Sequence, residues 1–412
     1  MKIAFVVQRY GAEILGGSEY HCRLIAERLA AKHEVEVLTT CARDYITWQN
    51  EYPEGADRIR GVTVRRFANA RTRDIESFNR YSDWIFSHDH SRADELRWIE
   101  EQGPWSPALL DFLQKRHRDY DALIFFTYLY APTVHGLGID PPRSILVPTA
   151  HDEPAIHLGL FREVFGQARA VAFNTDSERN FLKTTFPMRL VAEETVGCGV
   201  DLLQDEPLLP QEEPEDEEEA HKALPPHLRV RGTMFRRRHR LNGQFLLYGG
   251  RIDAGKGCEE LIEYFTSYKE QGGEAELALM GVKLMQLPEV PWVRFAGLLS
   301  ERERLQALEA ATVVVVPSPF ESLSLLALEA MAVGTPVLCN ARAEVLVDHC
   351  LKSNAGLFYQ DRDEFIECTR LLLADDRLRE RMGRNGKEYV RRHYRWDVIM
   401  QKYDRLLAAV TR

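Results

Sequence analysis

The chain has 412 residues, of which 45% are hydrophobic and 28% charged, and this composition excludes a wholly disordered protein. Its length predicts two or three domains at roughly 150 residues each. With 53 basic and 63 acidic residues the formal net charge is −10, which argues against nucleic acid as a partner because phosphate backbones are bound by basic faces.

The N-terminal residues 1–7 are apolar over too short a stretch for a secretory signal, and no run reaches the ~18 apolar residues that span a bilayer. The seven cysteines are scattered and odd in number, which fits neither a disulfide framework nor a zinc site. We therefore expect a cytoplasmic protein. Peripheral association with the inner face of the membrane stays open, because six arginines between positions 58 and 73 suit an anionic lipid as well as plain solvent.

Short apolar strands alternate with helices in the first half of the chain. The strands are expected at 2–7, 35–39, 62–67, 122–126, 144–149, 170–173 and 194–196, and the helices at 18–31, 107–117 and 177–185. Continuous apolar runs of this length are typical of parallel strands that are buried on both faces. Residues 1–201 are therefore predicted to form a doubly wound α/β domain.

Residues 202–240 differ from everything around them. They hold nine acidic residues within 205–219, then seven Lys or Arg within 221–240, and five prolines. Because this stretch lacks the apolar period of a helix or strand, we expect an exposed and flexible linker or insertion. A regulatory or partner-binding segment is the alternative interpretation.

The strand–helix alternation returns after the linker. Strands are expected at 244–248, 276–280, 292–295, 312–316 and 335–339, and helices at 258–269, 302–310, 325–333 and 363–374. Residues 241–390 are thus predicted to form a second doubly wound domain. Such sheets bind ligands beyond the carboxyl ends of their strands, so we expect the site in a cleft between the two domains.

Residues 391–412 predict a final amphipathic helix. Its apolar side chains recur at helical spacing: Trp396, Ile399, Tyr403, Leu406, Leu407 and Val410. Spacing alone allows this helix to pack either on its own domain or on the first one.

Two short motifs of the first half lie at the ends of predicted strands. Gly16 and Gly17 follow the first strand and permit a tight turn, with Ser18 as a candidate helix cap. His151 follows the strand at 144–149, at the end where α/β folds place reactive residues. A plain capped helix start and an ordinary loop histidine are the alternatives.

The segment Leu-Leu-Tyr-Gly-Gly-Arg-Ile-Asp-Ala-Gly-Lys-Gly at 246–257 ends a strand and turns through glycines into a helix. Gly250 permits close backbone approach, Arg251 offers a fork of donors and Lys256 a compact charge, which together suit a diphosphate. The segment is neither the phosphate loop that ends in Gly-Lys-Ser/Thr nor the dinucleotide Gly-x-Gly-x-x-Gly. A glycine-rich surface turn with two solvated cations is the alternative.

In the segment 313–338 a buried strand runs through Pro-Ser-Pro into a helix, and Glu321 lies at the junction. Glu329 follows just over two helical turns later, near the same side of the helix. The first amides of this helix, near Ser324 and Leu325, would form an anion site. Glu321 could be only an acid that complements the helix dipole, whereas Glu329 among Leu, Ala and Met needs partners such as the hydroxyls of a ribose.

Two other patterns are not expected to hold a metal. Asp361 and Asp363 form an Asp-x-Asp, but they precede an amphipathic helix as N-cap and first-turn acid. His88 and His90 are two positions apart and so do not share a helix face. No metal site is predicted.

Together these motifs resemble glycosyltransferase family four, whose members are retaining enzymes of the GT-B fold that use nucleotide-sugar donors. The resemblance rests on Gly-Arg-x-x-x-x-Lys-Gly at 250–257 and on the two glutamates of 321–329, and it covers most of the chain outside the linker. Segments at 103–110, 127–130 and 151–154 are similar to a subgroup of bacterial surface-polysaccharide synthesis. The GT-B fold implies two Rossmann-like domains that face a central cleft, with the C-terminal helix crossing back to the first domain.

The resemblance also implies roles for single residues. The donor-binding set that it implies is Arg251, Lys256, Glu329, Ser324, Leu325, Gly16, Gly17 and Gly250, and the catalytic pair is His151 and Glu321. Arg251 and Lys256 would bind the donor diphosphate, and Glu321 the hydroxyls of the transferred sugar. Two departures affect the donor side: the chain has Glu-Ser-Leu-Ser-Leu at 321–325 where many members have Glu-Gly-Phe-Gly-Leu, and Gly-Val-Lys at 281–283 where they have Gly-x-Gly.

We therefore expect a metal-independent retaining glycosyltransferase with no cofactor beyond its nucleotide-diphosphate sugar donor. The acceptor would be a hydroxyl of a glycan or lipid-linked molecule bound to the first domain. Two alternatives remain at the level of sequence: a nucleotide-sugar epimerase of the GT-B fold, and a non-catalytic protein that binds nucleotide sugars or glycans. The oligomeric state stays open.

Overall fold

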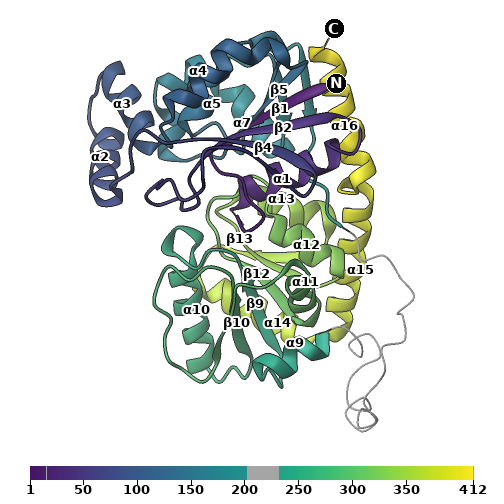
Figure 1. Cartoon of the computed structure of the whole chain (residues 1–412). Coiled ribbons are helices and arrows are strands. Elements are labelled where there is room, and N and C mark those ends of the chain that lie inside the picture. Colours follow the sequence, from purple (N-terminus) through teal and green to yellow (C-terminus); the bar gives the residue numbers. More distant parts are fainter. Residues whose placement is uncertain (15, 202–231, 412) are drawn as a thin grey trace. The chain divides into compact units, whose positions relative to one another are not determined.

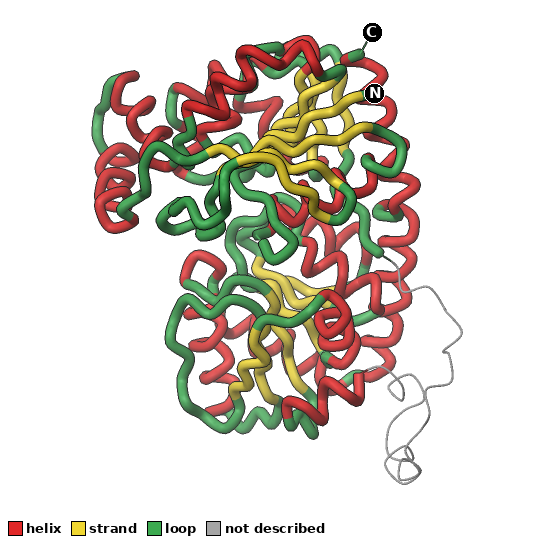
Figure 2. The backbone as a smooth tube through the Cα atoms, viewed as in Figure 1, coloured by secondary structure: helices red, strands yellow, loops and turns green. Residues whose placement is uncertain are grey.

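The structure is a computed structural model, and it describes residues 1–14, 16–201 and 232–411 (Figure 1). The chain divides into two compact units: unit 1 comprises Met1–Gly199 and Trp396–Arg412, and unit 2 comprises Val200–Arg395. Each unit holds one sheet with helices packed on it (Figure 2). Two Rossmann-like α/β domains, the fold class expected from the sequence, are thereby confirmed.

Unit 1 contains an eight-stranded sheet in the order β3-β4-β2-β1-β5-β6-β7-β8. Its strands are β1 (Lys2–Val6), β2 (Glu34–Thr40), β3 (Gly55–Ile59), β4 (Val62–Phe67), β5 (Ala122–Phe126), β6 (Ser144–Val147), β7 (Ala170–Phe173) and β8 (Ala192–Thr195). All neighbouring pairs run parallel except β3 and β4. The chain order reverses between β1 and β5, which makes this junction the switch point of the sheet.

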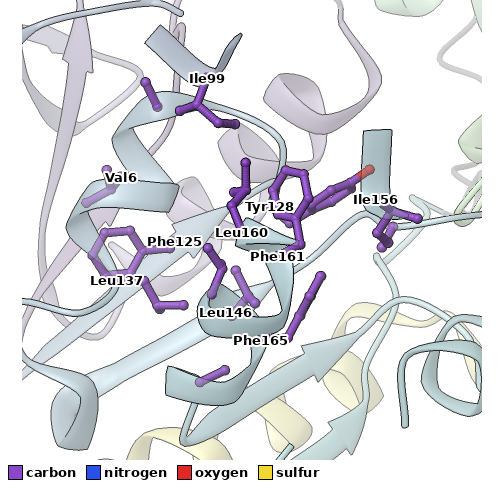
Figure 3. Packing of buried hydrophobic residues seen from close by; sticks show 14 of the residues in the cluster. Val6, Ile99, Phe125, Tyr128, Leu137, Leu146, Ile156, Leu160, Phe161 and Phe165 are labelled. Carbon is purple, nitrogen blue, oxygen red and sulfur yellow. The ribbon is translucent and has the colours of Figure 1, made fainter. Parts of the chain in front are cut away.

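Helices cover both faces of this sheet. They are α1 (Gly17–Leu29), α2 (Ile75–Ser87), α3 (Arg92–Gln102), α4 (Pro107–Arg116), α5 (Ala131–Gly136), α6 (Leu160–Gln167), α7 (Asp176–Thr185) and α16 (Trp396–Val410). Alternate residues of β1 supply the two sides: Ile3 and Phe5 join the cluster under α1 and α16, whereas Ala4 and Val6 join the one under α3, α4 and α6. Figure 3 shows aromatic rings from β5, from the loop after β5 and from α6 packed in this second cluster.

The C-terminal helix α16 belongs to unit 1, although the preceding helix, α15, belongs to unit 2. Ile399, Tyr403 and Leu407 are fully buried in the cluster that also holds β1 and α1. Lys402 Nζ donates to the carbonyl of Thr195 at 2.7 Å. The expectation that this helix crosses back to the first domain is confirmed.

Unit 2 contains a six-stranded parallel sheet in the order β11-β10-β9-β12-β13-β14. Its strands are β9 (Phe245–Gly249), β10 (Glu276–Met280), β11 (Val293–Gly297), β12 (Val313–Val316), β13 (Val337–Asn340) and β14 (Gly356–Tyr359). Its helices are α9 (Gly232–His239), α10 (Cys258–Glu270), α11 (Glu301–Ala310), α12 (Leu325–Val333), α13 (Glu344–Ser353), α14 (Arg362–Ala374) and α15 (Asp376–His393). Here the chain order reverses between β9 and β12.

Part of the predicted linker is a packed helix. Residues 232–239 form α9, in which Phe235 is buried, and a Cβ atom on Gly232 would lie 2.9 Å from Ala310 Cα in α11. Arg236 donates to the carbonyls of Gly243 and Ala310, both at 2.7 Å. The linker interpretation is therefore wrong for this end of 202–240, where the arginines of a short helix form structural contacts. Residues 202–231 lie outside the described residues.

No helix in the described part of the chain is both long and apolar enough to cross a membrane.

Candidate functional site

The two motifs of unit 2 lie at the carboxyl ends of neighbouring strands. The 246–257 segment leaves β9 and enters α10 through a short 3-10 helix (Ala254–Lys256), and the 317–324 loop leaves β12 and enters α12. Since β9 and β12 flank the switch point of a parallel sheet, both loops lie where open α/β sheets bind ligands.

Glycines bring the backbones of these loops into contact. Gly257 has φ +72°, and a Cβ atom there would lie 2.4 Å from the carbonyl oxygen of Pro317. Gly250 has φ +145°, and a Cβ atom on Gly281, at the end of β10, would lie 1.9 Å from the Gly250 carbonyl oxygen. The loops after β9, β10 and β12 are thus held against one another by backbone packing that any side chain would disrupt.

The central pair of this site is Lys256 with Glu321. Lys256 Nζ lies 2.7 Å from Glu321 Oε1 and 3.5 Å from Ser318 Oγ, and both ionic side chains are partly exposed. Asp253 fixes the approach of the lysine because its Oδ1 accepts from the backbone amide of Lys256 at 2.8 Å. Arg251 Nε lies 3.4 Å from Asp253 Oδ2. The structure therefore places two cations, Lys256 and Arg251, and two carboxylates, Glu321 and Asp253, around the same strand ends, a set that suits an anionic, hydroxyl-rich ligand.

Glu329 differs from its expected setting. It is buried in α12, and its Oε2 lies 2.8 Å from Arg304 Nη1 of α11. Burial raises the pKa of Glu329, and Arg304 opposes that rise. Arg304 is thus a partner of this buried carboxylate within the protein, and a contact of Glu329 with ribose hydroxyls stays a prediction. Arg304 escaped sequence reasoning because the 301–310 segment reads as an ordinary charged helix.

The start of α12 carries backbone strain. Ser324 occupies the N-cap position with φ +61° and ψ +80°, a left-handed conformation that L-residues adopt at a cost. Leu325 begins the helix, whose first amides have no partner within the helix. The family pattern has glycine where this chain has Ser324, so the serine follows a backbone path better suited to glycine.

In unit 1, Gly16 and Gly17 begin α1 beyond the carboxyl end of β1. A Cβ atom on Gly16 would lie 2.3 Å from Glu19 Oε2, whereas one on Gly17 would meet open space. Glu19 is buried and paired with Arg9 at 2.7 Å. Although burial opposes ionisation, Arg9 and nearby hydrogen bonds lower the pKa of Glu19.

The expected cap of α1 is wrong. Gly16 takes the N-cap position without a side-chain cap bond. The Ser18 hydroxyl instead donates to Glu19 Oε2 at 3.0 Å and accepts from Gln8 Nε2 at 3.2 Å. Because Ser18 lies inside the helix and not at its N-cap, its hydroxyl bonds to the buried carboxylate of Glu19 and not to the backbone amides of the first turn.

His151 lies in the loop after β6, within a small acidic cluster. Its Nε2 is 3.5 Å from Glu153 Oε2, and Glu153 Oε1 accepts from the Tyr128 hydroxyl at 2.5 Å. Burial would raise the pKa of Glu153, but His151 and the Tyr128 bond lower it. The Glu153 carboxylate therefore lies where it can orient the imidazole of His151.

The same strand ends carry two strained threonines. Thr127 and Thr149 have φ +68° and +52°, and their hydroxyls are 3.1 Å apart. A positive φ is an outlier for a β-branched residue, and such strain gathers at functional sites. No sequence signal marks it.

Glu178 of α7 joins this region to the next strand end. Its carboxylate accepts from the backbone amides of Ala150 and Asn174, both at 2.5 Å, and so ties the loop of His151 to the loop after β7. Burial outweighs these bonds and raises the pKa of Glu178 to about 8.

The remaining predicted residues fall outside these clusters. Asp361 caps α14 and Asp363 lies in its first turn, as expected. His88 ends α2, and His90 Nε2 lies 3.3 Å from Glu95. Among the residues that the structure describes, no group of three or more His, Cys, Asp or Glu side chains is placed to hold a metal ion.

Two of the six arginines offered for a membrane surface are buried inside unit 1. Arg66 is buried, lies over the ring of Tyr52 and pairs with Asp57 at 3.3 Å. Arg73 is buried too and donates to the carbonyl of Ile46 at 2.8 Å. These two side chains build the fold rather than face an anionic surface.

Comparison with known proteins identifies unit 2. Residues 233–389 match the family model described as glycosyl transferases group 1. Unit 2 therefore carries a glycosyl transferases group 1 domain. The candidate residues from Gly250 to Glu329 all lie within the matched region of this domain.

Relatives extend the similarity beyond the group 1 domain. A D-inositol 3-phosphate glycosyltransferase of Jonesia denitrificans is 24% identical over 270 residues, 61% of this chain and 59% of that protein. A glycogen synthase of Mycobacterium tuberculosis is 26% identical over 178 residues, 40% of this chain and 42% of the relative. The chain thus matches less than two thirds of the length of these relatives.

Solved structures share the fold over nearly the whole chain. Sucrose-phosphate synthase of Thermosynechococcus elongatus superposes with a TM-score of 0.64 at 19% identity, covering 99% of both chains. Anabaena HepE in complex with UDP and glucose gives 0.66 at 16% identity, again with 99% of both chains covered. WaaG, a glycosyltransferase involved in lipopolysaccharide biosynthesis, gives 0.59 at 15% identity, with 98% of this chain and 99% of WaaG covered. These likenesses confirm the GT-B fold class expected from the sequence.

Proposed function

We propose that this protein is a retaining glycosyltransferase of family four that moves a sugar from a nucleoside-diphosphate sugar to a hydroxyl of a glycan or lipid-linked acceptor. The observation that carries the proposal is the Lys256–Glu321 pair, 2.7 Å apart at the switch point of a group 1 domain. A cation for the diphosphate and a carboxylate for sugar hydroxyls are the two groups that such a donor needs side by side.

Charge development explains the other residues of unit 2. Breaking the sugar–phosphate bond places negative charge on the departing diphosphate, which Lys256, Arg251 and the amides at the start of α12 would stabilise. The backbone of Gly250 would lie close to the same group. Glu329 would hold the ribose while it shares its carboxylate with Arg304.

The reacting sugar would be held by Glu321, with its carboxylate beside the carbon that is attacked. The acceptor hydroxyl attacks from the face that the diphosphate leaves, and its proton passes to the leaving phosphate oxygen. This route retains the configuration of the sugar and uses neither a separate carboxylate base nor a metal.

Unit 1 takes the acceptor in this proposal. The backbone at Gly16 and Gly17 would approach the donor diphosphate. His151, oriented by Glu153, would act near the sugar and support the reaction centre.

The donor base and the biological setting draw on relatives. HepE binds UDP and glucose, and WaaG is involved in lipopolysaccharide biosynthesis. We extend the proposal to a UDP-sugar donor and to bacterial surface-polysaccharide synthesis on the cytoplasmic side of the membrane.

The first test is turnover. The protein is incubated with a panel of UDP-sugars and polysaccharide-derived acceptors, and UDP release and the anomeric configuration of the product are measured. Lys256→Ala and Glu321→Ala should each lower the rate by about 10²–10³-fold, while Lys352→Ala, which removes an exposed lysine paired with Asp348 in the same unit, should not.

Three outcomes would contradict the proposal. An inverted product would remove the retaining mechanism. An epimerised nucleotide sugar formed without acceptor would identify an epimerase. Saturable UDP-sugar binding with no UDP release from any donor would identify a binding protein.

A further inference from the structure

His349 is a buried histidine with both ring nitrogens engaged. It lies on α13, its side chain is 1% exposed, and its Nε2 is 2.8 Å from the carbonyl oxygen of Leu323. Its Nδ1 is 3.0 Å from the hydroxyl of Tyr389 on α15. No sequence pattern singles out His349, because a lone histidine in an amphipathic helix has no motif around it.

The two bonds define the state of the ring. A carbonyl oxygen only accepts, so Nε2 carries the proton and donates to Leu323, and Nδ1 accepts from the Tyr389 hydroxyl. Burial lowers the pKa of His349, while the Leu323 bond opposes that effect. In the neutral ring that burial favours, Nε2 donates to Leu323 and Nδ1 accepts from the Tyr389 hydroxyl.

The carbonyl that His349 holds belongs to the loop of the candidate site. Leu323 lies between Glu321 and Ser324, and its own side chain is buried. The first half of this loop is tied elsewhere: Asn340 Nδ2 donates to the Pro317 carbonyl at 2.9 Å. His349 is thus a tether at the end of the loop where it turns into α12.

That end of the loop needs a tether because it is strained. Ser324 has φ +61°, and a strained backbone persists only where surrounding contacts over-determine it. Losing the Leu323 bond would let the peptide after Leu323 rotate. Glu321 and the first amides of α12 would then shift together.

We propose that His349 is a positioning residue, which acts through the Leu323 carbonyl to hold Glu321 and the start of α12 in the geometry that binds the donor. This inference rests on the proposed function for its consequence, but the tether itself exists without any ligand. His349 does not touch the donor in this scheme.

Three variants separate the tether from mere packing. His349→Gln keeps an N–H donor at about the distance of Nε2. His349→Leu keeps volume but leaves the Leu323 carbonyl without its donor. Tyr389→Phe removes only the hydroxyl on the far side and keeps the Nε2 bond.

The first measurement is hydrogen–deuterium exchange of residues 318–328 in the protein without nucleotide. His349→Leu should speed exchange there about tenfold, the change expected from losing one hydrogen bond. His349→Gln and Tyr389→Phe should stay within about threefold of wild type. A core control is Leu372→Ala in α14, which is fully buried and remote from the loop in sequence. It should lower the melting temperature without speeding exchange at 318–328.

The second measurement is steady-state kinetics with the donor found for the wild type. His349→Leu should raise the donor KM about tenfold with a smaller change in kcat, and His349→Gln should restore KM. Leu372→Ala should leave KM unchanged at the assay temperature.

The two proposals fail in different ways. A wild-type protein without transfer activity would overturn the proposed function, and exchange in the nucleotide-free protein would still decide whether His349 tethers the loop. Wild-type exchange and KM in His349→Leu, or equal changes in Leu372→Ala, would overturn the inference on His349.

Discussion

Ser324, at the start of α12, has a backbone conformation that is unfavourable for a residue with a side chain. An L-residue in the left-handed region costs about 1–2 kcal/mol relative to its favoured conformations. The serine offers no cap bond to the helix that would offset this cost. Glycine would accept the same angles freely, at the price of a more flexible unfolded chain.

We predict that Ser324→Gly raises the free energy of unfolding by up to about 1 kcal/mol. Glycine relieves the backbone strain of the folded protein, but it also raises the conformational entropy of the unfolded chain, which offsets part of the gain. Urea unfolding monitored by circular dichroism measures the change. Ser324→Ala is the matched control, because it removes the hydroxyl but keeps the strained Cβ. A glycine variant no more stable than the alanine variant would show that the strain is absorbed elsewhere.

Glu178 carries the clearest pH dependence among the described residues of unit 1. Its pKa is raised to about 8 in the folded protein, whereas the unfolded chain titrates near 4.5. Between these values the unfolded state loses its proton first. The stability from this group is therefore complete below about pH 4.5 and is lost as the pH rises toward 8.

We predict that Glu178→Gln flattens the fall of stability between pH 5 and pH 8, by up to about 1.4 kcal/mol per pH unit. Thermal unfolding at half-unit pH steps measures the slope. The same substitution at Glu76, an exposed residue in the first turn of α2, should leave the slope unchanged. An unchanged slope in Glu178→Gln would mean that the carboxylate is ionised when buried.

At the scale of elements, α16 shows which contacts sequence periodicity conveys. The apolar spacing of Ile399, Tyr403 and Leu407 predicts one buried face, and all three are fully buried. Periodicity gives the face but not the partner, which here comes from unit 1.

We predict that Leu407→Ala lowers the free energy of unfolding of unit 1 by about 2–5 kcal/mol, because its cavity opens between α16 and the sheet. Hydrogen exchange resolved by segment should be faster than in the wild type in β7 and β8. Exchange in β9 and β12 of unit 2 should not change. Asp404→Ala, on the exposed side of the same helix, should change stability by less than about 0.5 kcal/mol. Faster exchange in unit 2 alone would contradict the packing of α16 described above.

Other elements could not be predicted from local pattern. The sequence pattern missed α2, α3, α5, α6, α13, α15, β3 and β14. Some of these elements, such as β14 and α5, are too short to show a period, and in others charged residues interrupt the apolar pattern. In α15, for example, arginines spread along the whole helix obscure the apolar face to which the buried Tyr389 and Val390 belong. The short helix α9 was read as linker for the same reason, since Phe235 alone marks its buried side.

At the scale of the whole molecule, the sequence predicted architecture better than contacts. Alternating strands and helices were enough for two doubly wound domains, because burial on both faces of a parallel strand leaves a continuous apolar run. The pairing of Glu329 with Arg304 and of His349 with Leu323 joins positions far apart in sequence. Only the folded backbone brings such residues together.

A net charge of −10 repels an anionic donor on average, but binding depends on where the charges lie. The cations and helix start at the candidate site, at Arg251, Lys256 and Ser324, all belong to unit 2. If the proposal is right, UDP alone should be held chiefly by this unit, without help from the sugar.

We therefore predict that UDP at 100 times its Kd raises the stability of unit 2 by about 2.7 kcal/mol. Segment-resolved exchange should show protection concentrated in the loops after β9 and β12. Lys256→Ala should remove most of this protection at the same UDP concentration, because the diphosphate loses its compact cation. Lys115→Ala in unit 1, an exposed lysine paired with Asp111, is the charge-matched control and should keep it. Protection that survives in Lys256→Ala would place the diphosphate on other residues and would overturn the site as assigned.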